Sequence, residues 1–140
     1  MLSSLFRLFL RAAWAPLAVL ILHGAIAETS LREPLDFTMH FLGGAAIAFF
    51  LFQAIECFPT LIGRITAPAH YLFSFTSACT VGLFWEFGEL FLDVFLHTHI
   101  QHDLHETLSD LIADACGAAC SLVLLFLIRR LSRRRARPGH

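Results

Sequence analysis

The sequence contains no lysine, and charged residues of any kind are scarce. They make up 15% of the 140 residues, whereas about a quarter is usual in soluble domains. The mean hydropathy is +0.70, and 57% of the residues are hydrophobic. These values place the chain in a lipid bilayer and predict a single domain. There is no room for a separate soluble catalytic domain, so any chemistry must use membrane helices and their short loops.

Several functional signatures are also missing. No serine or cysteine nucleophile stands with a matching base, and there is no phosphate-binding loop, internal repeat or nucleic-acid-binding pattern. The cysteines form no CxxC pair and fall mostly in apolar segments, which indicates small buried side chains rather than a disulfide framework. They are Cys57, Cys79, Cys116 and Cys120.

What remains is four apolar segments, each close to the length of about 20 residues that a membrane-spanning helix needs. They are residues 8–27, 36–56, 69–96 and 105–128. We therefore expect an all-α fold, an integral membrane bundle of four transmembrane helices within residues 1–128. An Arg-rich tail, residues 129–140, is expected to be a frayed and solvated end.

The arginines predict the orientation of this bundle. If both termini are cytoplasmic, Arg32 is the only one of the ten arginines on the outer side. The opposite orientation would reverse this asymmetry, against the positive-inside rule. Both termini are therefore predicted to be cytoplasmic, with the Arg-rich tail meeting anionic lipid headgroups.

The first segment has a second interpretation. Arg7 and Arg11, a short apolar run and the stretch Ala25-Ile26-Ala27 also fit a cleaved signal peptide. Cleavage would leave three spans with the same orientation, so the argument about the later spans holds either way.

Polar residues interrupt the apolar segments at helical spacing. The stretch "FWEFGELFLDVFL", residues 84–96, carries three carboxylates at positions i, i+3 and i+7, so they share one helix face. Similar polar faces occur in the second and fourth spans. The members of the three faces are Asp36 and His40; Glu86, Glu89 and Asp93; and His102, Glu106, Asp110 and Asp114.

With the predicted orientation, these three faces meet in the outer half of the membrane. A charged carboxylate near the bilayer centre costs at least about 2.5–3.5 kcal/mol, and spans two to four contain no arginine that could neutralise it. The charge must be balanced by bound protons, by a metal cation or by water in an outward-facing cavity. Carboxylates with an imidazole suit a divalent metal such as Mg²⁺, Mn²⁺, Ca²⁺ or Zn²⁺, while clustered acids also stay partly protonated.

We assign candidate roles on this basis. The candidate metal ligands are His40, Glu86, Glu89, Asp93, Asp110 and Asp114. Glu89 and Asp110 are also the candidate catalytic residues. The candidate supporting residues are Asp36, Glu106, Ser109 and His102.

Simpler structural roles compete with some of these assignments. Asp36 follows Pro34 in what reads as a connection, so it could be an N-cap. Asp103 with Glu106 three residues later is typical of a capping box. Glu56 is expected to be solvated at the cytoplasmic boundary. The run "HTHIQHDLH" could bind Zn²⁺ or could simply decorate the interface.

Three motifs carry a family resemblance. "LDFTMHFLGG", "FWEFGE" and "HDLHETLSDLIADACGA" resemble the YjdF-like family of bacterial inner-membrane proteins and, more distantly, VanZ-like proteins, over roughly residues 34–120. The resemblance implies a multi-pass protein of the bacterial inner membrane with a shared polar centre. The matching positions are Asp36, His40, Phe41 and Gly44; Trp85, Glu86 and Glu89; and Asp103, Glu106, Thr107, Ser109, Asp110 and Gly117.

The leading functional hypothesis is a membrane protein with a cation-binding site open to the extracytoplasmic side. Such a site could serve a metal-dependent enzyme that acts on an envelope or lipid headgroup. One alternative is proton or cation transport, since acidic residues in membrane helices often form relays. Another is a non-catalytic accessory role, as a homo-oligomer or as a subunit of a larger membrane complex.

Overall fold

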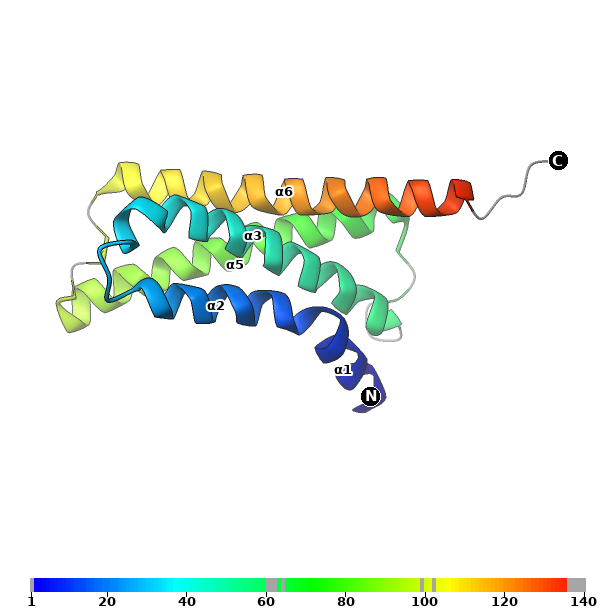
Figure 1. The fold of residues 1–140 in the computed structure, drawn as a ribbon, viewed down its shortest axis with the longest axis horizontal. Coiled ribbons are helices and arrows are strands. Elements are labelled where there is room, and N and C mark those ends of the chain that lie inside the picture. The colour runs from blue at the N-terminus through cyan, green and yellow to red at the C-terminus, as the bar shows by residue number, and fades with distance from the viewer. Residues whose placement is uncertain (1, 60–62, 64, 99, 102, 136–140) are drawn as a thin grey trace.

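The computed structural model describes residues 2–59, 63, 65–98, 100, 101 and 103–135, and this part of the chain is helical without any strand (Figure 1). The first apolar segment consists of three consecutive pieces, and three long helices follow. The elements are α1 (Leu2–Leu8), the π-helical turn η1 (Phe9–Ala13), α2 (Trp14–Ile26), α3 (Arg32–Cys57), α5 (Ala67–Leu96) and α6 (Leu104–Arg135).

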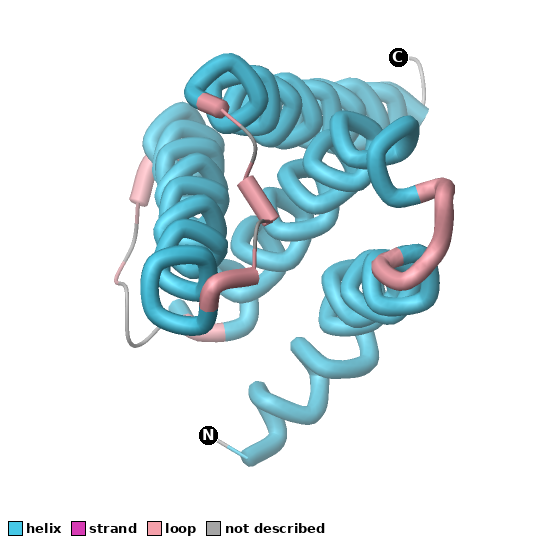
Figure 2. The backbone as a smooth tube through the Cα atoms, turned by 90° about the vertical axis from the view of Figure 1, so that its left-hand side faces the viewer, coloured by secondary structure: helices cyan, strands magenta, loops and turns pink. Residues whose placement is uncertain are grey.

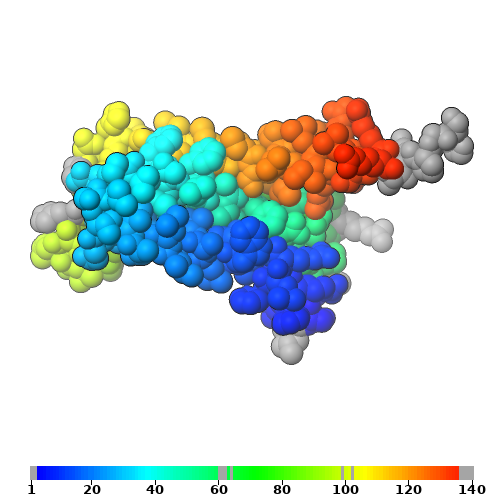
Figure 3. All heavy atoms as spheres, viewed as in Figure 1, coloured from blue at the N-terminus to red at the C-terminus, as the bar shows by residue number. Residues whose placement is uncertain are grey.

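A proline explains the break in the first segment. Pro16 has no N–H to donate to the carbonyl of Ala12, and its ring crowds that carbonyl. The wider π-helical turn Phe9–Ala13 lies directly before this point, where such turns typically relieve a disturbed helix. As a result α1 bends away from the axis of α2 (Figures 1 and 3), and Leu8 and Ala12 pack against Cys57 at the end of α3.

Helix α3 crosses the bundle obliquely, with α2 on one side and α5 and α6 on the other (Figure 2). Two glycines let α3 and α6 approach closely at their crossing. A Cβ atom at Gly44 would overlap the carbonyl oxygen of Asp114, and one at Gly117 would overlap the carbonyl oxygen of Phe41. Small residues serve the same purpose at many helix contacts in membranes.

The two ends of the bundle differ in chemistry. We call the end where α3 and α6 begin and α5 ends the site end, and the opposite end the arginine end. Between them lies an apolar core shared by α3, α5 and α6. It is formed by Ala48, Phe52, Ala78, Ala118 and Leu122.

The expected all-helical fold is confirmed, and two local expectations are wrong. The tail is not frayed from residue 129 onward, because α6 continues as a regular helix to Arg135. Pro34 does not lie in a connection, because α3 already begins at Arg32. A proline is tolerated there since the first-turn N–H groups have no acceptor within the helix.

Three helices of the described part are long and apolar enough to cross a membrane. They are Ser3–Ile26, Arg32–Cys57 and Leu104–Arg135. The fourth predicted span, α5, has 30 residues but falls outside this group. Its apolar residues are interrupted by three carboxylates, a histidine and several hydroxyl side chains, which lower its hydropathy.

Candidate functional site

Two helices bring a histidine and two aspartates together at the site end. Asp36 and His40 lie one turn apart on α3, and Asp110 lies on α6. One ligand atom from each of the three lies within 4.8 Å of the other two. His40 and Asp110 are buried, whereas Asp36 is partly exposed. Among the described residues, this trio is the group with the spacing of a metal site.

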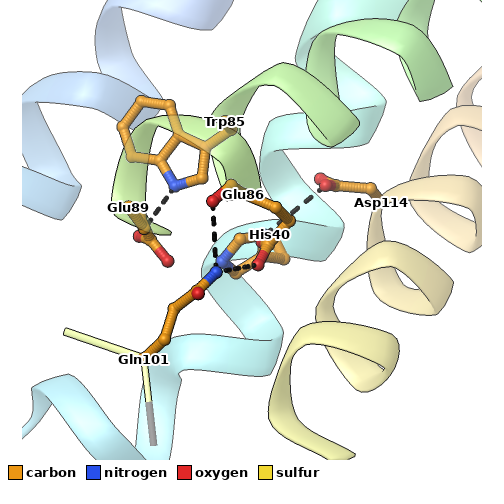
Figure 4. A network of polar contacts seen from close by, with 6 residues as sticks. All are labelled: His40, Trp85, Glu86, Glu89, Gln101 and Asp114. Carbon is orange, nitrogen blue, oxygen red and sulfur yellow. Dashed lines mark hydrogen bonds and ion pairs between the residues drawn. The ribbon is translucent and has the colours of Figure 1, made fainter. Parts of the chain in front are cut away.

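His40 also contacts two carboxylates that do not belong to the trio. The Nδ1 atom of His40 lies 3.4 Å from Oδ2 of Asp114 and 3.8 Å from Oε1 of Glu86. Figure 4 shows these side chains converging from three helices, α3, α5 and α6. His40 therefore belongs to both groups and links α3 to the acidic residues of α5 and α6.

Glycines make room for the carboxylate of Asp114. A Cβ atom at Gly82 would overlap Oδ2 of Asp114, and one at Gly43 would stand 3.7 Å from Oδ1. The carboxylate is thus enclosed between α3 and α5, where it is 8% exposed and faces Nδ1 of His40. This packing fixes the orientation of the imidazole ring.

Glu86 has one satisfied and one unsatisfied oxygen. Nε2 of Gln101 donates hydrogen bonds of 3.1 Å to Oε2 and to the backbone carbonyl of Glu86. No donor in the described part of the chain reaches Oε1, although the side chain is only 3% exposed. Buried polar atoms nearly always have a partner, so Oε1 is an acceptor for a proton, a water or a ligand.

Glu89 lies beside this group rather than inside it. Its Oε1 accepts a 2.9 Å hydrogen bond from the indole Nε1 of Trp85, one turn earlier on α5. The Trp85 ring also contacts His23 of α2 edge-on, with 5.4 Å between ring centroids. The pair therefore connects the acidic face of α5 with α2.

Asp93 organises the connection between α5 and α6. Its Oδ1 accepts hydrogen bonds from the Thr98 hydroxyl at 2.5 Å and from the Ile100 N–H at 2.6 Å. Its Oδ2 accepts one from the Gln101 N–H at 2.8 Å. These bonds place Gln101 where its side chain can reach Glu86.

The comparison with known families adds an independent observation. A family model described as "Predicted membrane protein (DUF2238)" matches residues 6–131. The chain belongs to this family. The YjdF-like family expected from the motifs is the same family, and the match extends beyond residues 34–120 in both directions. Neither a curated protein nor a solved structure matches the chain.

The residues predicted to support the site or to cap a helix in this DUF2238 protein have different outcomes. Glu106 and Ser109 are half-buried on α6 before Asp110, and His102 lies outside the described residues. The N-cap alternative for Asp36 is wrong, because α3 begins four residues earlier. The capping role of Asp103 is confirmed, since its Oδ1 accepts a 2.9 Å hydrogen bond from the Glu106 N–H.

Sequence reasoning misses two residues of this DUF2238 site. Gln101 has no predicted role because loop residues show no periodicity, although its position within the His-rich run is a usable signal. His23 reads in the sequence only as an isolated histidine of the first span. Its contact with Trp85 depends on how α2 is rotated, which a featureless apolar helix does not reveal.

Proposed function

We propose that this DUF2238 protein binds a divalent metal cation at the site end and presents it to a lipid or envelope headgroup. The observation that carries the proposal is the trio Asp36, His40 and Asp110, with ligand atoms within 4.8 Å of one another. The buried, unsatisfied Oε1 of Glu86 beside His40 supports it independently. A cation would balance carboxylates that have no arginine partner in the described structure.

The donor chemistry narrows the choice of metal. One imidazole nitrogen and two carboxylates suit Zn²⁺ or Mn²⁺ better than Ca²⁺, which prefers oxygen ligands alone. Mg²⁺ remains compatible because it often binds through few carboxylates and keeps its waters. When bound, such a cation lowers the pKa of a coordinated water and polarises phosphoryl or carbonyl oxygens.

The surrounding residues then have distinct proposed roles. Asp114 orients the His40 ring, as carboxylates commonly do for metal-bound histidines. Glu86 offers Oε1 as an acceptor for a proton or a water near the trio. We assign Asp110 as a ligand and place Glu89 and Asp93 outside the ligand set. Oε1 of Glu89 accepts a hydrogen bond from Trp85, and both oxygens of Asp93 accept hydrogen bonds from Thr98, Ile100 and Gln101.

The proposed orientation of the protein in the membrane is based on the distribution of its arginines. We propose four spans with both termini in the cytoplasm of a bacterial inner membrane, which places the site end on the extracytoplasmic side. Helix α5 is included because it packs along α3 and α6, which are both apolar enough to span. Its 30 residues correspond to roughly 45 Å of helix, more than the bilayer core requires.

A transport function is less well supported by the packing. A relay would need polar groups or water between the site and the arginine end. The buried cluster between them is instead apolar, with Ala48, Ala78 and Ala118 among its members. The buried hydroxyl of Ser74 on α5 donates to the backbone carbonyl of His70. A proteoliposome flux assay that rises above background would favour transport over the proposal.

Elemental analysis of the purified protein tests the cation site directly. We expect about one equivalent of a divalent metal, and a higher thermal midpoint with the metal than after chelation. At a concentration of 100 times Kd, binding adds about 2.7 kcal/mol of stability. The variants His40→Ala and Asp110→Asn should lose both the metal and the shift.

The matched control is Asp103→Asn, at the same end of α6. Asparagine is as good an N-cap as aspartate, so this variant should keep its metal. If the wild-type protein holds no metal and chelation leaves its thermal midpoint unchanged, the proposal is wrong. An accessory role would then account better for the acidic cluster.

A further inference from the structure

An elongated cavity of about 280 Å³ lies between α2, α3 and α5 and reaches the acidic cluster. Most of its wall is apolar, with Val19 and Leu20 from α2, Met39 and Ile47 from α3 and Val81 from α5. The stretch from Met39 to Ile47 rises about 12 Å along α3 at ~1.5 Å per residue. The cavity therefore extends lengthwise along α3, as an acyl chain beside a membrane-spanning helix would.

The cavity opens toward the surrounding lipid. Among the described residues, no Cα atom of α2 comes within 8 Å of one of α5, so these helices leave an opening between them. Leu20, Val81 and Trp85 line the cavity and are 53%, 42% and 40% exposed. The ring contact between His23 and Trp85 bridges the opening at the site end.

The polarity of the wall changes along its length. Toward the arginine end the lining residues are Pro16, Ile47 and Ala78, and toward the site end they include His23 and His40. Asp114 lies at the inner wall, facing His40. Such a wall matches an amphiphile whose tail points toward the arginine end and whose polar group points toward the site.

We propose that this cavity binds one acyl chain of a membrane lipid, which enters between α2 and α5 with its headgroup near His40 and Asp114. The observation that favours a lipid over a water-soluble ligand is the opening, which lies between two membrane-facing helices. The inference deepens the proposed function because it names the substrate class. Acyl-chain binding itself needs no metal, so it can be tested separately.

Photo-crosslinking tests the proposal in reconstituted vesicles. A phosphatidylethanolamine that carries a diazirine in its acyl chain is photolysed with the protein, and the modified residues are mapped by mass spectrometry. Met39 and Ala78 line the cavity but are only 4% and 2% exposed. Adducts at these two positions are expected, since a tail can reach them only from within the cavity.

Adducts restricted to outward-facing residues such as Ile21 and Phe84, which are 70% and 66% exposed, would overturn the proposal. The variant Val19→Phe adds bulk to the cavity wall and should lower the Met39 adducts severalfold. The matched control Ile21→Phe makes the same kind of change on the lipid-facing side of α2. It should leave the Met39 adducts unchanged.

The variant Asp36→Asn separates this proposal from the metal site. It removes one proposed ligand that does not line the cavity. If both proposals hold, it loses metal and keeps the Met39 adducts. Metal binding without such adducts would remove only the lipid proposal, and adducts without metal would remove only the cation site.

Discussion

A glutamate lies near each end of the bundle, and its two oxygens are satisfied differently at the two ends. At the arginine end, both oxygens of Glu56 accept hydrogen bonds from Arg129, at 2.6 and 2.7 Å. The same guanidinium lies over the ring of Phe52, 4.4 Å from its centroid, and His70 stacks on Phe52. At the site end, Glu86 is more deeply buried, and one of its oxygens lacks a donor.

We propose that this difference separates a structural acid, Glu56, from a functional one, Glu86. A carboxylate paired with two nitrogens of one arginine has its hydrogen bonds satisfied and holds α3 against α6. A carboxylate whose oxygen lacks a donor weakens the fold unless something else binds there. Glu56 is exposed, as expected, and it is also paired, because α6 stays helical past residue 128 and brings Arg129 within reach.

The largest effect is expected from the close helix crossing at the site end. Gly117→Ala places a Cβ atom on the carbonyl oxygen of Phe41, so α3 and α6 must move apart. We expect a loss of at least about 2 kcal/mol of stability, measured as a lower thermal midpoint in detergent. The distance between the two helices, and with it the trio, depends on this contact.

Gly88→Ala on α5 is the matched control, since a Cβ atom there would meet nothing within 4 Å. Alanine is the better helix former by roughly 0.5–1 kcal/mol, so this variant should be neutral or slightly more stable. Equal losses in both variants would show that the crossing is not the sensitive point of the fold.

The same substitution, glutamate to glutamine, can be made at each end, and its effects on stability can then be compared. Glu86→Gln removes a buried charge whose oxygen lacks a donor, so in the presence of a chelator it should raise stability by about 1 kcal/mol. Glu56→Gln breaks a half-exposed ion pair and should lower stability by less than about 1 kcal/mol. Thermal unfolding of both variants measures these two changes in stability. If both changes had the same sign, the proposed difference between the two glutamates would be wrong.

The smallest effect is expected from the loop that covers Glu86. Gln101→Ala removes two hydrogen bonds to Glu86, which are worth about 1 kcal/mol each or less. We expect a small drop in thermal midpoint and faster release of metal to a chelator. His105→Ala, an exposed change on the first turn of α6, should alter neither, whereas equal effects of both variants would exclude a covering role for Gln101.

Helical periodicity is sufficient to predict much of this molecule. The spacing of Asp36 and His40, and of Asp110 and Asp114, predicts that each pair shares one helix face. The chain forms long helices there because the segments are apolar and contain few helix breakers. Gly43 and Gly44 also indicate a close approach of another helix to α3, although their partner Gly117 stands out in the sequence only as part of a motif.

The contacts that depend on loops and on helix rotation could not be predicted. Asp93 shares its helix face with Glu86, yet the loop conformation directs its oxygens to the backbone of residues 100 and 101. Glu89 shares that face too, but Trp85 lies within reach one turn away. Periodicity gives the face on which a side chain lies, and neighbouring donors then decide what it binds.

The π-helical turn Phe9–Ala13 has a consequence for the whole of the first apolar segment. Residues before the turn are anchored on Cys57, while residues after it present Val19 and Leu20 to the cavity. Deleting one residue from the turn would rotate everything that follows by about 100° around the helix axis. The number of residues in this turn, more than their identity, therefore determines which face of α2 lines the proposed lipid cavity.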